Sequence, residues 1–457
     1  MSGPTGGEPL DIAVLGAGHV GLVSAVCLAA IGHHVRVLDI DERRIERLAG
    51  GEVPFLEPGL DELLTKARSL GRISFHAKPD ALPGATLVFL CVDTPNRPEG
   101  QVDLSSVVSA THAAAQHASD GAVIVNRSTA PVGTADYISS IIEERRGRPL
   151  PVIANPEFLA EGTAVRDFLA PDRIVIGTRK EADAAPLLEA YEPIVTRNLP
   201  ADLPEGVHEK AMAGPDTVPV LVAAPPTAEL IKYAANAFLA VKVSFINEIA
   251  GISEELGGDI TEVARALGLD HRIGPHFLRA GIGWGGSCFP KDIVALQGMA
   301  ETRGLSARML GAANAVNADQ RRWVIRKLQQ HLKTLVGRRV GLLGLAYKPM
   351  TDDLRDAPSL EIAAELARLS VQVRGFDPAI KAVSPDAEGI LDTVDGPLAL
   401  AQGADALVLV TEWPEFRELD LAELARAMRE PLILDGRNFL DPEAVRTAGF
   451  TYVSVGR

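Results

Sequence analysis

The first forty residues contain a glycine-rich turn set between a strand pattern and a helix pattern. Residues 11–16 read as a buried strand that runs into GAGHVG, and an Ala-rich apolar helix pattern follows at 22–31. A second strand pattern, HVRVLD, ends at Asp39. The G-x-G-x-x-G spacing, with an acidic residue at the end of the second strand, is typical of a dinucleotide-binding βαβ unit. The order of these elements therefore predicts a doubly wound parallel sheet.

This unit also predicts which cofactor is bound. A helix N-terminus and bare glycine backbone can receive a pyrophosphate, and a carboxylate can accept hydrogen bonds from both ribose hydroxyls. That carboxylate would repel a 2′-phosphate, so the pattern favours NAD over NADP. The alternative is a glycine-dense βα turn without a ligand. The predicted cofactor contacts here are Gly16, Gly18, Val20, Gly21 and Asp39.

The bulk properties exclude several classes of protein. A chain of 457 residues is too long for one hydrophobic core and predicts two or three domains. The net charge of −15 argues against nucleic acid or an anionic membrane as a partner. Three widely separated cysteines, Cys27, Cys91 and Cys288, fit a reducing cytosol and give neither a disulfide framework nor a metal site. The start, MSGPTGGEPL, does not resemble a signal peptide, and no apolar run reaches the ~18 residues of a membrane span, so we expect a cytoplasmic protein.

Three later strand patterns, at 85–95, 122–134 and 151–164, each run into a polar loop. Ligands of open α/β sheets bind beyond the carboxyl ends of the strands, so polar residues there are placed to touch one. The alternatives are helix caps for the hydroxyls and solvated surface charges for the glutamates. The two glutamates are four residues apart and would share a face if their segment is helical. The residues concerned are Thr94, Ser128, Thr129, Glu157 and Glu161.

A long helix pattern extends from Thr227 to about Leu256, with Glu229 suited to its first turn. At 1.5 Å per residue this helix would be ~43 Å long, which predicts that it joins two domains and packs against a second subunit. Lys232 and Asn236 are four residues apart and project from one face. The alternative for the lysine is that its stem lies on apolar neighbours while its ammonium reaches solvent.

The sequence GIGWGGSCFPKD, at 281–292, places Cys288 among four glycines and just before a lysine and an aspartate. Glycines let a backbone approach a ligand closely, and a thiol beside a cation is more readily the nucleophilic thiolate. The alternative is a glycine-rich turn around a small buried cysteine. Upstream, Arg272 can hold a phosphate and Phe277 can pack on a base, although a surface position is the alternative.

Residues 338–378 show a second strand–loop–helix–strand pattern without the G-x-G-x-x-G spacing, so a second dinucleotide is not expected. Lys348, Arg355 and Arg437 follow strand patterns in an acidic protein and predict a phosphorylated ligand; surface salt bridges are the alternative. The predicted fold is α/β, with two Rossmann-like doubly wound domains joined by a long central helix. The predicted domains are 1–226, 227–320 and 321–457.

Seven segments, taken in order, resemble the UDP-glucose/GDP-mannose dehydrogenase family over nearly the whole chain beyond residue 10. They are the NAD unit, STAPVGT, NPEFLAEG, AELIKYAANA, GIGWGGSCFPKD, AYKPMTDDLRDAPS and DGRN. The resemblance implies two successive NAD-dependent oxidations that turn the C6 alcohol of a nucleotide sugar into a carboxylate without releasing the aldehyde. The FPKD ending favours UDP-glucose, giving UDP-glucuronate; GDP-mannose or a UDP-N-acetylhexosamine is the alternative. A hypothesis of another class is an inactive NAD-binding scaffold.

The resemblance also implies roles for particular residues. Cys288 would capture the aldehyde as a thiohemiacetal and then hold a thioester. Hydrolysis would be assisted by Glu157 or Asp292, and a water held by Thr129 and Asp292 would take the first proton, with Lys232 and Asn236 around the substrate oxygen. The implied cofactor contacts beyond the first turn are Arg44, Thr94, Thr129, Lys291 and Arg355. The implied substrate contacts are Glu157, Glu161, Lys232, Asn236, Arg272 (reaching the partner subunit's site), Phe277, Gly285, Lys348 and Arg437.

Two features depart from the family pattern. Trp284 stands where the family usually has another aromatic residue, Tyr or Phe. Residues 192–222 form a connection longer than usual by roughly 15–20 residues, and a long loop containing Pro and Gly predicts either a functional lid or disorder.

Overall fold

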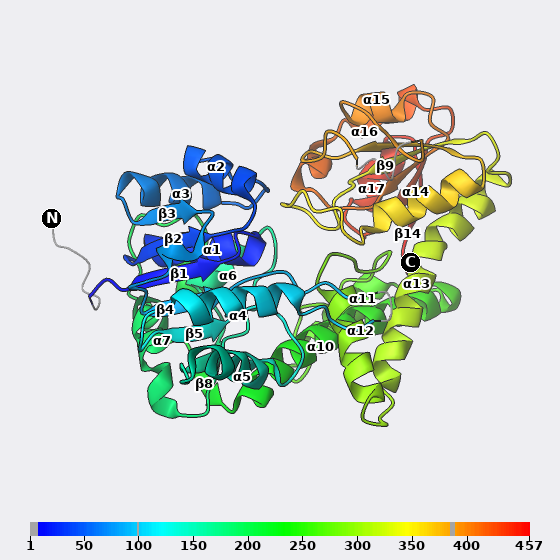
Figure 1. Cartoon of the computed structure of the whole chain (residues 1–457). Coiled ribbons are helices and arrows are strands. Elements are labelled where there is room, and N and C mark those ends of the chain that lie inside the picture. Colours follow the sequence, from blue (N-terminus) through cyan, green and yellow to red (C-terminus); the bar gives the residue numbers. More distant parts are fainter. Residues whose placement is uncertain (1–7, 98–99, 384–388) are drawn as a thin grey trace. The chain divides into compact units, whose positions relative to one another are not determined.

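The computed structural model describes residues 8–97, 100–383 and 389–457. Contacts divide the chain into two compact units, Met1–Ala234 and Ala235–Arg457. Each unit contains one predominantly parallel sheet with helices around it (Figure 1). The predicted fold, two Rossmann-like doubly wound units with a long central helix, is confirmed.

The first unit is built on an eight-stranded sheet with the order β3-β2-β1-β4-β5-β6-β7-β8. Neighbouring strands are parallel except β6 and β7, which pair antiparallel. The central strands are continuous apolar runs because helices cover both faces of the sheet. The strands are β1 (Asp11–Leu15), β2 (His34–Leu38), β3 (Ile73–His76), β4 (Leu87–Leu90), β5 (Val123–Asn126), β6 (Val152–Ala154), β7 (Ile174–Gly177) and β8 (Val220–Ala223).

Alternate residues of β1 enter different cores, as the pleat of a strand requires. Ile12 and Val14 pack with α1 (His19–Ala30), α3 (Leu60–Ser69) and α6 (Ala164–Leu169), whereas Ala13 and Leu15 pack with α4 (Ser105–His117) and α5 (Thr134–Arg146). The helices of this unit are α1 (His19–Ala30), α2 (Glu42–Gly50), α3 (Leu60–Ser69), α4 (Ser105–His117), α5 (Thr134–Arg146), α6 (Ala164–Leu169), α7 (Ala185–Ala190), α8 (Glu192–Val195) and α9 (Val207–Ala213), with 3₁₀ turns η1 (Pro79–Ala81) and η2 (Glu181–Ala184).

The segment 192–222 is built from short regular elements, so the prediction of a disordered loop is wrong. It contains α8, α9 and β8, and β8 extends the sheet by pairing parallel with β7. Val207, Ala211 and Val218 are buried in the core of the first unit. The segment is ordered because its short elements contribute apolar side chains to a core that already exists.

Helix α10 (Pro225–Leu256) begins two residues before the predicted start and ends where predicted. By length and composition alone it is apolar enough to cross a membrane, so the prediction that the chain contains no such segment is wrong. Five of its polar side chains are instead hydrogen-bonded to groups outside α10, as expected for a helix packed in a protein. These side chains are Glu229, Lys232, Asn236, Ser244 and Asn247.

The second unit is built on a six-stranded parallel sheet with the order β11-β10-β9-β12-β13-β14, the same order as the first six strands of the first unit. The strands are β9 (Arg339–Leu343), β10 (Gln372–Phe376), β11 (Asp392–Thr393), β12 (Ala406–Leu409), β13 (Leu432–Asp435) and β14 (Thr451–Ser454). The helices are α11 (Ile260–Leu269), α12 (Phe289–Glu301), α13 (Arg308–Leu332), α14 (Pro358–Arg368), α15 (Pro397–Ala401), α16 (Leu421–Ala427) and α17 (Pro442–Thr447), with the 3₁₀ turn η4 (Pro414–Glu418).

Candidate active site

The turn between β1 and α1 is shaped by its glycines. Gly16 has φ of 102°, and a Cβ there would lie 2.3 Å from the carbonyl oxygen of Cys91. A Cβ on Gly21 would lie 1.9 Å from the carbonyl oxygen of Gly16. At Gly18 the nearest atom would be Asp93 Oδ1 at 3.9 Å, so the space in front of it is open. Two glycines thus close the turn, and the third leaves room for a phosphate at the N-terminus of α1.

Asp39 lies directly after β2, and three hydrogen bonds fix its carboxylate, one of them from the N–H of Asp41 to Oδ1 (2.9 Å). Its Oδ2 accepts hydrogen bonds from the backbone N–H of Ala17 (2.7 Å) and from Arg44 Nη1 (3.1 Å). Val20, another predicted cofactor contact, is half-buried in the first turn of α1. The arrangement fits a dinucleotide, because a glycine cradle and a carboxylate at the end of the second strand are the groups that hold its pyrophosphate and ribose.

Replacing Asp39 with serine is expected to shift cofactor preference from NAD toward NADP. The variant loses a charge-assisted acceptor for the ribose, and it frees Arg44 to face a 2′-phosphate. We expect kcat/KM for NAD to fall roughly 10- to 100-fold, the equivalent of about 1.5–3 kcal/mol, while kcat/KM for NADP rises. Steady-state kinetics with both cofactors test this. The control is Asp41→Ser, which removes a nearby carboxylate but keeps a good N-cap residue for α2, and it should leave the ratio unchanged.

Hydroxyl groups tie the ends of β4 and β5 together. Thr94 Oγ1 donates to the carbonyl oxygen of Thr129 (2.6 Å), and Ser128 Oγ both accepts from and donates to the backbone of Val92. The N-caps of α4 and α5 are Leu104 and Gly133 instead, so the helix-capping alternative for these hydroxyls does not apply. Glu229, expected to serve its own helix, accepts from the N–H groups of residues 133 and 135 and so caps α5. Thr129 remains half-buried at the strand end.

Glu157 and Lys232 form a buried ion pair. Lys232 Nζ donates to Glu157 Oε1 at 2.8 Å, and the side chains of Lys232 and Glu157 are only 4% and 5% exposed, respectively. The backbone N–H of Leu159 donates to the second carboxylate oxygen (2.6 Å). Lys232 Nζ also lies 5.6 Å from the centre of the Phe158 ring. The predicted alternative, a lysine reaching solvent, is therefore wrong because the ammonium is paired inside the unit.

The environment of Glu157 keeps its carboxylate charged. Burial by itself would raise the pKa of Glu157, but the charge and hydrogen bond of Lys232, the Leu159 N–H and the charge of Arg127 together hold this pKa below its ordinary value. A small cavity of about 40 Å³ lies beside Glu157. Glu161 is half-buried in a turn, and residues 155–163 are not helical, so the two glutamates do not share a helical face.

Sequence reasoning missed another buried carboxylate in this unit, Glu57. Its oxygens accept from the backbone N–H groups of Gly162 and Ala164, both at 2.7 Å, and Glu57 Oε2 lies 3.0 Å from His19 Nε2. His19 is the first residue of α1, so Glu57 joins the cofactor turn to the loop that carries Glu161. These partners are far apart in the sequence, and no spacing pattern links them.

In the second unit, the glycines of residues 281–286 let the cysteine loop pack closely on the chain's own backbone. A Cβ on Gly281 would lie 2.8 Å from the carbonyl oxygen of Gly436, and one on Gly285 would lie 2.2 Å from that of Asp356. Gly286, with φ of 85°, packs against a tyrosine ring. The close approach predicted from these glycines is thus an approach to neighbouring loops of the same unit.

Cys288 is exposed and is the N-cap residue of α12. One turn later, Asp292 is 1% exposed and accepts two hydrogen bonds, from Asn236 Nδ2 (2.6 Å) and from Lys291 Nζ (2.7 Å). The Oγ of Ser287 lies 3.7 Å from the Cys288 sulfur. The structure therefore brings four predicted residues to the start of α12, where the helix dipole favours negative charge. They are Asn236, Cys288, Lys291 and Asp292.

The other predicted ligand residues of the second unit lie on loops, and most have partners of their own. Arg272 pairs with Asp270, and Arg355 pairs with Asp353. Lys348 Nζ lies 5.3 Å from the centre of the preceding tyrosine ring. Phe277 has φ of 61°, and its ring centre lies 6.3 Å from that of Phe289. Their roles toward a ligand stay predictions.

Arg437 lies in the loop that directly follows β13 and connects two segments of the second unit. Its Nε donates to the carbonyl oxygen of Val410 (2.7 Å), and its Nη1 donates to that of Gly283 (2.9 Å). Asp435, buried at the end of β13, accepts from the N–H groups of residues 437, 439 and 440 and shapes this loop. Arg437 therefore ties the end of β12 to the cysteine loop.

Only Cys288 is expected to react with iodoacetamide in the native protein near pH 7.5. Burial raises the pKa of Cys27 and raises that of Cys91 to about 12, so both remain protonated and covered, whereas Cys288 is exposed. Peptide mass spectrometry should find one alkylated cysteine before denaturation and three afterwards. Native labelling of Cys27 or Cys91 at a rate similar to that of Cys288 would contradict the structure.

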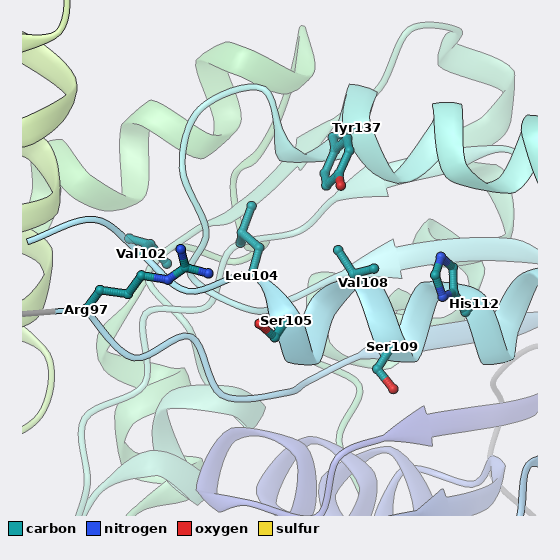
Figure 2. A pocket seen from close by; sticks show the side chains of 8 residues that line it. All are labelled: Arg97, Val102, Leu104, Ser105, Val108, Ser109, His112 and Tyr137. Carbon is teal, nitrogen blue, oxygen red and sulfur yellow. The ribbon is translucent and has the colours of Figure 1, made fainter.

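A groove of about 550 Å³ lies over α4 and α5 in the first unit, and none of its lining residues is a predicted ligand residue. Figure 2 shows Tyr137 of α5 on one side and the residues of α4 along the other. Its lining residues are Arg97, Val102, Leu104, Ser105, Val108, Ser109, His112 and Tyr137.

Within residues 8–97, 100–383 and 389–457, no group of three or more His, Cys, Asp or Glu residues is arranged to hold a metal ion.

Three domain models of the UDP-glucose/GDP-mannose dehydrogenase family match the chain. The NAD binding domain matches residues 10–195, the central domain matches 226–319 and the UDP binding domain matches 341–442. The interval 196–225 lies outside these matches, and it contains most of the segment that departs from the family pattern.

Relatives of known name match over nearly the full length. The UDP-glucose 6-dehydrogenase of Pseudomonas aeruginosa is 42% identical, with 98% of each chain covered. A solved UDP-glucose dehydrogenase from Pyrobaculum islandicum is 36% identical over 100% of both chains, with a TM-score of 0.88. A UDP-D-ManNAc dehydrogenase from Pyrococcus horikoshii is 26% identical over 98% of this chain and 99% of that one, with a TM-score of 0.83.

Proposed function

The chain belongs to the UDP-glucose/GDP-mannose dehydrogenase family and binds NAD, and within that family we propose that it oxidises UDP-glucose to UDP-glucuronate. The observation that carries this proposal is Cys288, an exposed thiol at the start of α12, with the buried Asp292 one turn behind it. A thiol suits an oxidation that passes beyond the aldehyde, because it is both a nucleophile and a leaving group.

The first step removes a proton from the C6 hydroxyl and a hydride from C6, which leaves an aldehyde. Bound NAD supplies the hydride acceptor for each oxidation. We assign to Asp292 and Thr129 the role of holding the water that takes the proton. The ammonium of Lys232 and the amide of Asn236, one helical turn apart on α10, would stabilise negative charge on the substrate oxygen.

The later steps pass through the sulfur of Cys288. The thiolate adds to the aldehyde carbon, so a C–S bond forms and the oxygen becomes the hydroxyl of a thiohemiacetal. Loss of a second hydride and proton leaves a thioester. Water, activated by Glu157 or Asp292, adds to the thioester carbon, the C–S bond breaks, and the carboxylate and the thiolate separate. In total the alcohol gains one water and loses two hydrides and three protons on its conversion to the carboxylate.

The choice of sugar is supported by the relatives. The chain is 42% identical to a protein named UDP-glucose 6-dehydrogenase but only 26% identical to one named UDP-D-ManNAc dehydrogenase. A match of residues 341–442 to a UDP binding domain supports a uridine nucleotide. We assign the phosphate and uridine contacts to Arg272, Phe277, Gly285, Lys348 and Arg437, and further cofactor contacts to Lys291 and Arg355.

Turnover of separate nucleotide sugars tests this assignment. We expect NADH formation with UDP-glucose to exceed that with GDP-mannose and with UDP-N-acetylmannosamine by at least about 100-fold in kcat/KM, because a mismatched polar group in a buried site is costly. Turnover of one of the other sugars without turnover of UDP-glucose would replace the proposed substrate. Binding of NAD without turnover of any sugar would favour the inactive scaffold.

We also propose that the protein is cytoplasmic and that it forms a homodimer along α10. We propose that residues 1–226 bind the cofactor, that residues 227–320 form the dimer and that residues 321–457 bind the UDP-sugar. Phe238, Phe245 and Ile252 follow one another at seven-residue intervals and are 65%, 50% and 49% exposed. Seven-residue spacing keeps side chains on nearly one face of a helix. An exposed apolar stripe of this kind is typical of an interface, and a two-fold axis would pair it with itself.

Glutamate at both Phe238 and Phe245 is expected to halve the molecular mass in solution. Four carboxylates would then face one another across a two-fold axis, so association is lost. The molecular mass measured by light scattering should fall from about twice 48.4 kDa to the mass of a single chain. Val336→Glu, which charges an equally exposed site outside α10, is the control. A monomeric native protein, or an unchanged mass in the double variant, would remove α10 as the interface.

A further inference from the structure

The side chain of Asn317 holds both backbone groups of Trp284. The N–H of Trp284 donates to Asn317 Oδ1 (2.8 Å), and Asn317 Nδ2 donates to the carbonyl oxygen of Trp284 (3.0 Å). A side-chain amide thus takes the place that a neighbouring strand would occupy beside an extended residue. Trp284 lies four residues before Cys288.

This contact has little freedom to shift. Asn317 is 6% exposed, and a Cβ on Gly283 would lie 2.6 Å from Asn317 Oδ1, so the loop backbone rests directly on the amide. Gly283 has φ of 95°, which a residue with a Cβ rarely adopts. The amide and the glycine that lets it approach therefore fix the loop together with two arginines. Arg437 donates to the carbonyl oxygen of Gly283 (2.9 Å), and Arg321 donates to that of Trp284 (2.9 Å). Asn317 supplies the acceptor for the Trp284 N–H.

A second set of hydrogen bonds surrounds the first. Asn247 of α10 accepts from the N–H of Gly281 through Oδ1 (2.8 Å), and Gln320 of α13 donates to the carbonyl oxygen of Asn247 (2.8 Å). The indole Nε1 of Trp284 donates to Ser244 Oγ (3.0 Å). Asn317 and Gln320 are three residues apart on one face of α13, so this helix fixes the loop both directly and through α10.

We propose that Asn317 is a positioning residue that keeps the Cys288 sulfur aimed at the aldehyde. The inference rests on the proposed function, because it assumes that Cys288 captures the aldehyde. Asparagine supplies a donor and an acceptor on one short side chain, which matches the C=O and N–H of a single residue. An aspartate could accept from the Trp284 N–H but would place a carboxylate oxygen against its carbonyl oxygen.

The test compares Asn317→Ala, Asn317→Asp and Asn317→Ser with the native enzyme under limiting UDP-glucose. The first oxidation does not need the thiol, so we expect it to change only a few-fold. Capture by a sulfur displaced by about 1 Å should slow roughly 100-fold, so aldehyde escapes and is trapped by hydroxylamine. The ratio of NADH to sugar then falls from two toward one.

A second readout is independent of turnover. Loss of the amide contact should speed hydrogen exchange at the Trp284 N–H at least about 10-fold, measured by mass spectrometry on peptides covering 281–288. Asn314→Ala is the matched control, because Asn314 lies on the same helix and bonds the Gln297 side chain instead of the loop backbone. This control should keep the native ratio of NADH to sugar.

The outcomes separate this inference from the proposed function. A native enzyme that does not form two NADH per UDP-glucose contradicts the proposed function. A native enzyme that does, together with folded Asn317 variants that also form two NADH and release no aldehyde, overturns the positioning role of Asn317. Failure of all three variants to fold would assign Asn317 to the fold alone and would overturn that role as well.

Discussion

Replacement of Cys288 with serine is expected to stop the oxidation of UDP-glucose at the aldehyde. A serine hydroxyl at neutral pH is a far weaker nucleophile than a thiolate, and an alkoxide is a poor leaving group from an ester. Formation of UDP-glucuronate should fall by roughly 10³-fold or more, the scale seen when an enzyme loses its nucleophile. The first oxidation should continue, because its donors and its proton acceptor are unchanged.

The measurement is the product distribution with hydroxylamine present, together with the NADH yield per sugar. The Cys288→Ser variant should give about one NADH and a trapped aldehyde. Cys27→Ala is the control, because Cys27 is a buried cysteine of α1 and should leave the products unchanged. Acid formation by Cys288→Ser at the native rate would remove the thioester from the mechanism.

Replacement of Lys232 with methionine is expected to cost about 3–5 kcal/mol of stability as well as activity. The change leaves the Glu157 carboxylate buried without its cation, and one unpaired buried charge is more costly than losing a whole pair. The double variant Lys232→Met/Glu157→Gln should recover most of this stability and yet remain inactive. Denaturant unfolding at pH 7 measures the difference.

The pH dependence of this loss follows from the ionisation of Glu157. In the native protein its pKa is lowered, so its contribution to stability is complete above the unfolded pKa of about 4.3 and is lost as pH falls through the folded pKa. In Lys232→Met burial should raise the pKa, so the folded state binds a proton before the unfolded state does. The difference in free energy of unfolding between the native protein and Lys232→Met should therefore become smaller as pH falls from 7 toward 5.

A solvent-exposed ion pair provides the comparison. Arg265 and Glu262 are 70% and 63% exposed, so Arg265→Ala should cost far less stability than Lys232→Met. A Lys232→Met variant as stable as Arg265→Ala, or a deficit that does not change with pH, would mean that Glu157 and Lys232 are not a tightly coupled buried pair.

Local patterns were sufficient to predict most of the fold. The glycine turn, the strands around it and the helix Pro225–Leu256 follow from periodicity and spacing within short windows. Local patterns do not predict the structure of 192–222, because α8, α9 and β8 are each too short to show a period. Val207 and Val218 are buried there by a core that other segments form. The length of that segment was recognised, but its packing was not.

The candidate site was predictable as a set of residues but not as a set of contacts. Cys288, Asp292 and Asn236 were named from motifs, and the structure brings Asn236 and Asp292 within 2.6 Å. The pairing of Lys232 with Glu157 joins residues 75 apart in sequence. The Asn317 contact with Trp284 spans 33 residues, and neither separation has a sequence signal. Such contacts depend on how the elements pack, which one sequence does not encode locally.

The number of NADH molecules formed per molecule of UDP-glucose, with sugar limiting and NAD in excess, tests the central claim most directly. A thiol that captures the aldehyde predicts two NADH for each UDP-glucose consumed, one UDP-glucuronate formed and no aldehyde trapped by hydroxylamine. One NADH for each UDP-glucose, with the aldehyde as the final product of the native enzyme, would contradict it.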